Sequence, residues 1–347
     1  MNLKMLKDYC FALGVSGNEK AVSKVMKNYL VNCVDETFYD NLGSLVSLKK
    51  GDSQFKVMLM GHMDEIGLIV SRISDDGYLF VSPIGGINPT ILLNELVDIT
   101  TRDNQVYSGV VGSDFGKNTP TMDKIYIDLG LSSKKDVLDK GIKENDVITF
   151  RKHFEVLNGS NNILGSCFDD RIGVYIITKV MQEISKERFE YDLYCVGSTQ
   201  EEVGLRGSKT STHLVDCDIA VNVDVTYGDD TPNNMGSIKL GKGVAIGLCD
   251  GSVLGNRGMV DYFIDLCQRL KLDYQFDSIP LGGTDSGSIF SHNIGVFTLT
   301  LSIPQRYMHQ GVGIINSKDV DDCVKIIVEF LKEIDFDLLE KIKLSNR

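Results

Sequence analysis

The first hydrophobic pattern along the chain has the period of a helix. In "SGNEKAVSKVMKNYL", residues 16–30, apolar side chains recur every three to four positions. Ser16 stands three positions before Glu19, which is the spacing of a capping box. The pattern therefore predicts an amphipathic helix whose first turn is capped by Ser16.

A strand-rich stretch follows this helix. Turn-forming segments such as "SDDG", "SPIGGINP" and "TRDN" separate short apolar or alternating runs. The runs predict strands at Lys56–Met60, Leu68–Ile73, Tyr78–Val81, Leu96–Thr100 and Gln105–Val111. Between about residues 69 and 161 the pattern predicts no amphipathic helix longer than two turns. This interval is expected to form an antiparallel β domain.

After residue 161 the pattern alternates between helix and strand, which predicts an α/β layer with a mixed or largely parallel sheet. Ser317 is expected to cap the last helix. The predicted elements are a helix from Asp170 to about Ile184, strands at Asp192–Ser198 and Asp218–Val225, a helix at Met259–Leu270, a strand at Gly295–Leu301, and a helix from Ser317 to about Ile334. The simplest organisation is an α/β domain, residues 1–68 and 162–347, interrupted by a β domain, residues 69–161.

Composition and charge exclude several classes of protein. The 347 residues are 42% hydrophobic and 24% charged, and no apolar run approaches the roughly 20 residues of a membrane span. The N-terminal segment alternates charged and apolar residues, so we expect no secretory signal and a cytoplasmic location. A net charge of −12 without a Lys/Arg cluster argues against nucleic acid as a partner.

The eight cysteines are scattered, with no CxxC motif. Most stand in apolar stretches, where a free thiol packs as a small hydrophobic group. We therefore expect free thiols in a reducing compartment rather than a disulfide framework or a thiolate metal site.

Polar side chains gather directly after the predicted central strands. Because the sites of open α/β sheets form at the carboxyl ends of strands, these side chains are expected to face one cleft. An acidic pair at the start of a predicted helix adds one further candidate. The set is His62, Asp169 or Asp170, Glu201, Glu202, Asp224 and His309.

Two imidazoles with several carboxylates suit a borderline divalent cation such as zinc, cobalt or manganese. A single zinc ion needs only three of these ligands. The full set suits two ions roughly 3.5–4 Å apart, which activate a water and stabilise the displaced oxygen. One member of the pair Glu201–Glu202 could then bind metal while the other takes the proton of the water.

Six motifs carry a resemblance to a known family. In order they are "GHMDEIG", "FDDRIG", "TQEEVGLRG", "VDVTYGDDTP", "GGTDSG" and "IPQRYMH". In their order and separation the chain resembles, over nearly its full length, the co-catalytic metallo-aminopeptidases, which comprise the tetrahedral, glutamyl and deblocking aminopeptidases. Some members carry an endoglucanase or cellulase label.

The resemblance implies an α/β/α catalytic domain of the zinc-exopeptidase type with a mixed sheet. It also implies a PDZ-like β insertion that drives assembly of dimers and dodecamers. The implied activity is release of the N-terminal residue from peptides by a water that two divalent metals, zinc or cobalt and also manganese, activate.

The resemblance implies a ligand for each metal position. His62 and Asp224 would bind one ion, Glu202 and His309 would bind the other, and Asp169 would bridge the two.

Two further residues are implied to serve the reaction itself. Glu201 matches the general base that deprotonates the water, and Asp64 matches the aspartate that orients the His62 imidazole. The resemblance leaves Asp170 as a helix cap or as support for the ligands.

The substrate-binding residues are less specific. Gly283, Thr284 and Asp285 are expected to line the substrate pocket, although "GGTDSG" would also make a tight turn. Arg306 is expected either to receive a peptide carboxylate or carbonyl or to form a buried ion pair. The chain departs from the family at Gly313, where relatives commonly carry a glutamate.

Two other functions compete with an exopeptidase. A metal-independent glycoside hydrolase would use paired carboxylates, but it has no use for His62 and His309, and the chain has no tryptophan to stack on sugars. A non-catalytic assembly module would keep the fold without binding metal. A single histidine after a strand is usually a surface residue, so the complete ordered set carries the metallopeptidase hypothesis.

Overall fold

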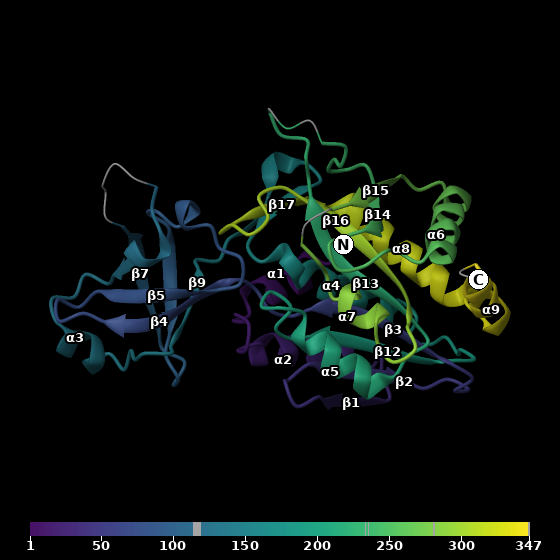
Figure 1. Cartoon of the computed structure of the whole chain (residues 1–347), viewed down its shortest axis with the longest axis horizontal. Coiled ribbons are helices and arrows are strands. Elements are labelled where there is room, and N and C mark those ends of the chain that lie inside the picture. The colour runs from purple at the N-terminus through teal and green to yellow at the C-terminus, as the bar shows by residue number, and fades with distance from the viewer. Residues whose placement is uncertain (114–118, 233, 235, 280–281, 346–347) are drawn as a thin grey trace.

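The computed structural model describes residues 1–113, 119–232, 234, 236–279 and 282–345. A large α/β unit contains the N-terminus and the C-terminus of the chain, and a β barrel stands out from one side of it (Figure 1). None of the helices in these described ranges has the length and apolar character that a membrane span requires.

The α/β unit is built on an eight-stranded sheet in the order β1-β2-β12-β3-β13-β16-β14-β15. The central strands β12, β3, β13 and β16 are mutually parallel, whereas β1, β2 and the β14–β16 pair add antiparallel edges. The predicted mixed sheet is confirmed. The strands are β1 (Glu36–Tyr39), β2 (Leu45–Lys49), β3 (Lys56–His62), β12 (Asp192–Ser198), β13 (Ile219–Tyr227), β14 (Val244–Cys249), β15 (Tyr274–Ser278) and β16 (Phe297–Gln305).

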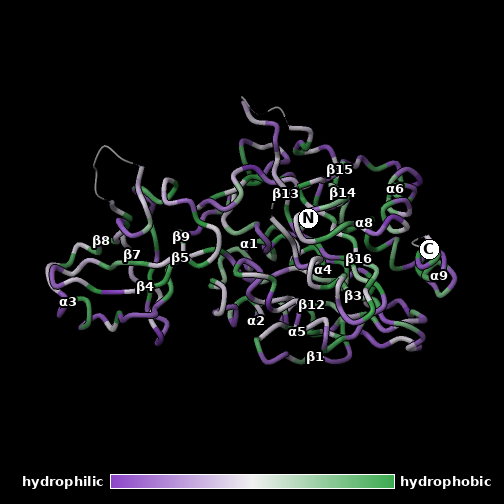
Figure 2. Tube along the Cα trace, viewed as in Figure 1, coloured by the Kyte–Doolittle hydropathy of each residue, from purple (hydrophilic) through white to green (hydrophobic). Residues whose placement is uncertain are grey.

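Helices cover both faces of this sheet, which gives the α/β/α layering. Alternate residues of β3 show the division, since Val57 and Leu59 join the larger core under α1, α2, α4, α6 and α8, while Met58 and Met60 join the smaller core under α5 and α7. Hydrophobic residues accordingly gather along the central strands (Figure 2). The helices are α1 (Leu3–Phe11), α2 (Lys20–Leu30), α4 (Phe168–Glu183), α5 (Arg206–Val215), α6 (Arg257–Leu270), α7 (Ser286–Phe290), α8 (Ser317–Glu333) and α9 (Phe336–Leu344).

The insertion is a closed barrel in the strand order β4-β5-β8-β7-β6-β9 with its own apolar core. This confirms the PDZ-like β domain, whereas its bounds at residues 69–161 and its role in dimerisation stay predictions. The described residues of the barrel include a short α-helix, α3 (Lys134–Asp139). The strands are β4 (Gly67–Ile73), β5 (Leu79–Ile84), β6 (Leu96–Thr100), β7 (Val106–Gly112), β8 (Tyr126–Asp128) and β9 (Val147–Phe150).

A small antiparallel sheet joins the exit of the barrel to the C-terminal part of the chain. It has the order β10-β11-β17, so residues 154–165 pair with a segment that follows His309. Its strands are β10 (Phe154–Val156), β11 (Asn162–Gly165) and β17 (Gly313–Asn316), and single 3-10 turns lie at η1 (Pro89–Ile91), η2 (Met122–Lys124) and η3 (Leu157–Gly159).

Two predicted helix caps are wrong. Helix α2 begins at Lys20, so Ser16 and Glu19 form no capping box, and their side chains bond elsewhere, as described below. Asn316 rather than Ser317 caps α8, because the Asn316 side chain accepts a hydrogen bond from the backbone N–H of Lys318. Several elements also lie outside the predicted segments, among them α1, β1, β2, α5, β14, β15, α7 and α9.

A buried ionic cluster fastens the barrel to the α/β unit. Glu65 lies just before β4, Lys152 just after β9 and Arg171 in α4. The Glu65 carboxylate accepts hydrogen bonds from Lys152 Nζ and, at 2.9 Å, from Arg171 Nη2. Burial alone would raise the pKa of Glu65, but the two cations lower it below its usual range. Both chain crossings into the barrel are therefore held at one point.

Arg171 is fully buried and also donates to the backbone carbonyls of Tyr9 and Ala12 at 2.8 and 3.0 Å. We expect Arg171→Met to lower the free energy of unfolding by about 3–5 kcal/mol, because it leaves a buried carboxylate with one partner fewer. The measurement is the denaturant midpoint at fixed protein and metal concentrations.

The matched control is Arg257→Met. This exposed arginine lies 3.8 Å from Asp261, so its loss is expected to cost less than about 1 kcal/mol. Equal shifts of the midpoint in the two variants would contradict the role of the buried cluster.

Candidate metal centre

Three parallel strands bring the first candidate ligands to one edge of the sheet. β12, β3 and β13 are neighbours, and Ser198 at the end of β12 is in register with His62 at the end of β3. Glu201 and Glu202 follow β12 after a short turn, and Asp224 lies in β13. The strand order thus places these side chains together, as the sequence predicts.

Asp169 lies between the two imidazoles. Its Oδ1 is 3.0 Å from His62 Nε2, and its Oδ2 is 3.2 Å from His309 Nε2. On the first side, Asp224 Oδ1 lies 4.0 Å from His62 Nε2. On the second side, Glu202 Oε2 lies 3.4 Å from His309 Nε2. The donors therefore form two groups that share the Asp169 carboxylate.

Glu201 stands beside this arrangement rather than within it. Its Oε2 is 4.0 Å from His62 Nε2, and its side chain borders the open cavity in front of the ligands. Both glutamates border the cavity, but Glu202 is the one next to His309 and the one that belongs to a group of possible metal ligands.

Close packing of α4 on β3 sets the distance between His62 and Asp169. A side chain at Gly61 would lie 2.9–3.0 Å from the backbone of Gly173 and Val174, so only glycine permits this approach. The peptide bond between Asp169 and Asp170 is cis. The first turn of α4 therefore lies directly against the end of β3.

Asp170 holds that junction from within. Its Oδ2 accepts a hydrogen bond from the backbone N–H of His62 at 3.1 Å, and its Oδ1 accepts one from Gly173 at 2.9 Å. His62, Asp170 and Asp224 offer oxygen and nitrogen atoms close enough to share an ion. Because both Asp170 oxygens already accept backbone hydrogens, we assign this residue to positioning.

Asp64 organises the opposite side of the cluster. Its Oδ1 lies 3.5 Å from His62 Nδ1 and accepts the backbone N–H of Glu201 at 3.0 Å. Its Oδ2 accepts from Ser16 Oγ at 2.6 Å and from the backbone N–H of Glu202 at 3.2 Å. One buried carboxylate therefore holds the backbone of both glutamates and lies beside the His62 ring, whose Nδ1 has no hydrogen-bond partner.

The barrel domain contributes one contact to the centre. His309 Nδ1 donates a hydrogen bond to the carbonyl oxygen of Gly86, which follows β5, at 3.1 Å. With its hydrogen on Nδ1, the imidazole presents Nε2 toward Asp169 and Glu202. This is the arrangement that metal-binding histidines commonly have.

Crowding of buried acids controls the charges in the cluster. Burial, reinforced by neighbouring carboxylates, raises the pKa of Glu202 to about 8 and that of Asp224 to about 7, and raises the pKa of Glu201 well above its usual range. Burial lowers the pKa of His309, but Asp169 and Glu202 raise it more, to about 9. The raised carboxyl pKa values show that negative charge is costly in this site, and a bound cation would offset that cost.

The donor set fits divalent metal ions. Imidazole nitrogens and carboxylate oxygens without thiolates suit zinc, cobalt and manganese. His62, Asp169 and Glu202 offer atoms within 4.8 Å of one another, and Glu202 Oε1 is buried without a hydrogen-bond partner. A bound cation would satisfy that oxygen.

An open cavity of about 480 Å³ lies in front of the ligands, within the usual range for small-molecule sites. Gly283 and Thr284 of "GGTDSG" line it, and their role in substrate binding stays a prediction. Asp285 is instead buried behind it, where it accepts a hydrogen bond from Ser198 Oγ.

Arg306 and Gly313 lie away from the open cavity. Arg306 forms a two-bond ion pair with Asp230 at 2.6 and 2.8 Å, the second of the two expected arrangements, and its role in substrate binding stays a prediction. Gly313 starts β17, and a side chain there would come within 2.7 Å of Gln305 Nε2. The family's glutamate would therefore require Gln305 to move.

Comparison with known proteins places this arrangement in a family. Residues 43–326 match the family described as M42 glutamyl aminopeptidase. The chain belongs to this family. It is similar to the lysyl aminopeptidase of Pyrococcus furiosus, with 32% identity over 96% of this chain and 98% of that protein.

Solved structures of M42-type aminopeptidases have the same fold. An aminopeptidase from the archaeon Desulfurococcus kamchatkensis superposes with a TM-score of 0.94 at 33% identity, covering 98% of this chain and 97% of that one. The TET1 peptidase of Pyrococcus horikoshii, which can assemble into a tetrahedron or a large octahedral shell, gives 0.85 at 28% identity, covering 95% and 99%.

Membership of the M42 family decides between the functions that the sequence left open. The protein is a metal-dependent aminopeptidase, a hydrolase acting on peptide bonds. The glycoside hydrolase and the non-catalytic module are not needed to explain any feature of the centre.

Sequence reasoning missed several supporting groups. Ser16 and Glu19 serve the site rather than α2, since Glu19 Oε1 accepts the backbone N–H groups of Gly17 and Gln200 at 2.7 and 3.1 Å. Neither the Gly86 carbonyl nor the bonds of Asp170 leaves a pattern in the sequence. The spacing of Ser16 and Glu19 is compatible with a helix cap and also with two residues that support the site.

The contacts of Asp64 generate a test. We expect Asp64→Asn to weaken divalent-metal binding by about 10–100-fold. The amide has a single oxygen that accepts hydrogen bonds and an NH2 group in place of the other, so the His62 ring would be less well oriented. Calorimetric titration of the metal-free protein with zinc or cobalt measures this. The exposed Asp76→Asn in the barrel is the control, and indistinguishable titrations for the two variants would contradict the assignment.

Proposed function

We propose that the centre holds two divalent ions, zinc or cobalt, and that Glu201 is the general base for hydrolysis at the N-terminal residue of a peptide. His62 and Asp224 would hold one ion, Glu202 and His309 the other, and Asp169 both. The observation that carries the proposal is that each Asp169 oxygen faces a different imidazole, at 3.0 and 3.2 Å.

Divalent ions held by these residues would supply Lewis acidity, to acidify a water and polarise the scissile carbonyl. Glu201 takes the proton of the attacking water and returns it to the leaving amine. Its position at the cavity and its raised pKa suit a group that must both accept and release a proton. Asp64 keeps His62 in place while this happens. The surrounding carboxylates favour a free amino terminus, which limits cleavage to the first residue.

The two adjacent glutamates allow a sharp test of these roles. We expect Glu201→Gln to lower kcat by about 10²–10⁴-fold while the metal content stays unchanged, because the variant loses only the base. Glu202→Gln, its matched neighbour, is expected to lose metal because it removes a ligand. Aminopeptidase assays and elemental analysis of the purified variants measure the two effects.

Loss of metal from Glu201→Gln, or full turnover by it, would reject Glu201 as the base. A wild-type protein that binds no divalent metal and hydrolyses no aminoacyl substrate would reject the proposal as a whole.

We further propose that the protein forms homo-oligomers through the barrel domain, residues 69–161, as dimers that build a dodecamer. The likeness to a TET peptidase that assembles supports this. On the barrel, Leu96 and Val110 are cross-strand partners on β6 and β7, and both are exposed, at 43% and 42%. Apolar pairs of this kind mark contact surfaces when they join a larger patch.

Light scattering tests the assembly. We expect a particle mass that is a multiple of the 38.4 kDa chain, and we expect Val110→Lys to reduce it by placing a charge in the contact. The control is Leu214→Lys on α5, which is similarly exposed at 47% but lies outside residues 69–161. A monomeric wild-type protein would refute the assembly, and an unchanged mass in Val110→Lys would remove the barrel face from it.

A further inference from the structure

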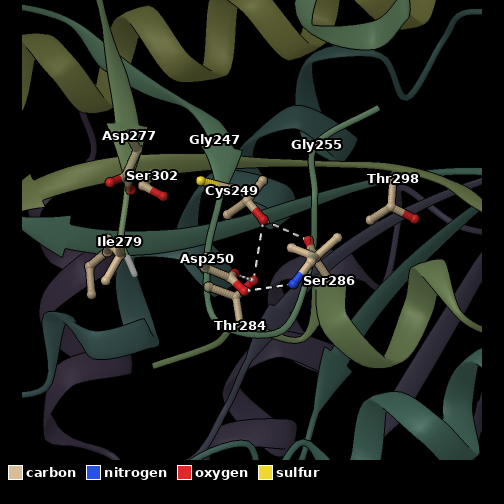
Figure 3. A pocket seen from close by; sticks show the side chains of 13 residues that line it. Gly247, Cys249, Asp250, Gly255, Asp277, Ile279, Thr284, Ser286, Thr298 and Ser302 are labelled. Carbon is tan, nitrogen blue, oxygen red and sulfur yellow. Dashed lines mark hydrogen bonds between the residues drawn. The ribbon is translucent and has the colours of Figure 1, made fainter. Parts of the chain in front are cut away.

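A second recess adjoins the cavity in front of the metal centre (Figure 3). The two spaces share part of their walls, formed by Val225, Asp250, Ile279 and Thr284. A substrate whose first residue lies at the metal centre has this recess as a neighbouring space for its side chain.

Sheet register shows how near the recess is to the centre. Ser302 on β16 is the direct partner of Asp224 on β13, and paired residues of neighbouring strands lie on the same face about 5 Å apart. Asp277 on β15 lies beside Ser302 (Figure 3). Gly247 on the intervening β14 is in register with Asp277 and has no side chain to fill the space.

The recess is lined by acidic and hydroxyl groups. Two carboxylates, Asp250 and Asp277, and several hydroxyls line it, and the lining residues that the structure describes include no lysine, arginine or histidine. An acidic side chain would therefore meet like charges, whereas a cationic one would meet opposite charges.

The two carboxylates differ in what they already bind. Asp250 Oδ1 accepts three hydrogen bonds, from Ser252 N, Ser252 Oγ and Val253 N, and its Oδ2 accepts one from Thr284 Oγ1. Asp277 is only 4% exposed, yet its Oδ1 has no hydrogen-bond partner. Burial raises the pKa of this carboxyl group, and the nearby hydroxyls of Thr226 and Ser302 lower it. Because buried carboxylate oxygens are rarely left unpaired, a cationic ligand at Oδ1 would stabilise the ionised form.

Size restricts the ligand further. The recess has a volume of about 20 Å³, room for about one water-sized group. A primary ammonium is of that size and donates three hydrogen bonds, whereas a planar guanidinium is larger. A water molecule would fill the same volume, but it would leave the negative charge uncompensated.

We propose that this recess receives the side chain of the substrate's first residue and selects a primary ammonium, so that the enzyme releases N-terminal lysine in preference to arginine, neutral and acidic residues. The inference rests on the proposed function, because it requires the metal centre to hold the amino terminus. Despite the glutamyl description of the family, glutamate is the residue that this recess rejects most strongly.

Steady-state kinetics on aminoacyl p-nitroanilides test the proposal. With saturating cobalt, kcat/KM for the lysyl substrate is expected to exceed that for the norleucyl substrate, its neutral isostere, by about 10–100-fold, the usual effect of one hydrogen-bonded charge. Arginyl should fall between them and glutamyl should be lowest. A glutamyl rate equal to or above the lysyl rate overturns the proposal.

Variants connect the preference to one side chain. Asp277→Asn is expected to lower kcat/KM for the lysyl substrate by about 10–100-fold and to change the norleucyl value by less than about threefold. Asp261→Asn on the exposed face of α6 is the control and should change neither. Equal losses on both substrates would show that Asp277 is structural, and would overturn the proposal.

A binding measurement on the unmodified enzyme covers the case in which Asp277→Asn does not fold. Lysinamide should inhibit hydrolysis of leucyl p-nitroanilide about tenfold more tightly than norleucinamide. Equal inhibition would refute the ammonium site. Hydrolysis of the leucyl substrate without lysyl preference rejects only this inference, whereas no hydrolysis of any substrate rejects the proposed function.

Discussion

The carboxylate of Asp169 lies between two imidazoles, and the geometry of the centre depends on its staying there. His62 reaches it from the end of β3, and His309 reaches it from the loop after β16. Two segments so far apart in the sequence can meet on one carboxylate only if α4 begins directly against β3. Gly61 permits that approach, and Asp170 fixes it with hydrogen bonds to the backbone of both elements. The acids that surround Asp169 repel one another in a buried space, so the arrangement is stable only with compensating positive charge. The repulsion between these carboxylates destabilises the empty site, and it favours the binding of cations there.

The inserted barrel is part of this arrangement rather than an appendage to it. The carbonyl of Gly86 orients the His309 ring, and the same loop borders the cavity. At the root of the barrel, Glu65 receives Lys152 and Arg171, and Glu65 stands one residue after Asp64. A displacement of the barrel would therefore act on the centre from two directions. Because buried ion pairs tolerate little change of geometry, a movement of the barrel is expected to move the residues of the centre as well.

How much the sequence could predict differs between strand positions and loop positions. The period of the apolar residues located β3, β12 and β13, and residue types after each strand were sufficient to propose His62, Glu201, Glu202 and Asp224. Contacts that depend on backbone shape could not be predicted. Cys167, Gln200 and His309 adopt positive φ angles of 60°, 56° and 57°, which residues other than glycine rarely do. These turns aim Asp169, the two glutamates and His309, yet no local preference indicates them.

Ser16 and Glu19 matched a helix cap by spacing, and tertiary contacts with Asp64 and Gln200 overrode it. Arg306 could have met a substrate or an acid, and only the fold brings Asp230 beside it.

The proposed metal ligands and the proposed selectivity recess are largely separate in the structure, so the recess could change while the ligands stay the same. The proposed ligands lie in β3, β13 and α4 and in the loops after β12 and β16, whereas the recess is formed mainly by residues of β14, β15 and β16 themselves. Substitution at Asp277 or Gly247 changes the charge or depth of the recess without touching a ligand. The acids of the recess and of the centre also differ in their hydrogen bonds. Asp277 Oδ1 accepts none, whereas both carboxylate oxygens of Asp64 and of Asp170 accept one or more. The carboxylates whose oxygens all accept hydrogen bonds, Asp64 and Asp170, hold the structure. Asp277, with an unpaired oxygen in a recess beside the open cavity, is the carboxylate that we propose selects the substrate.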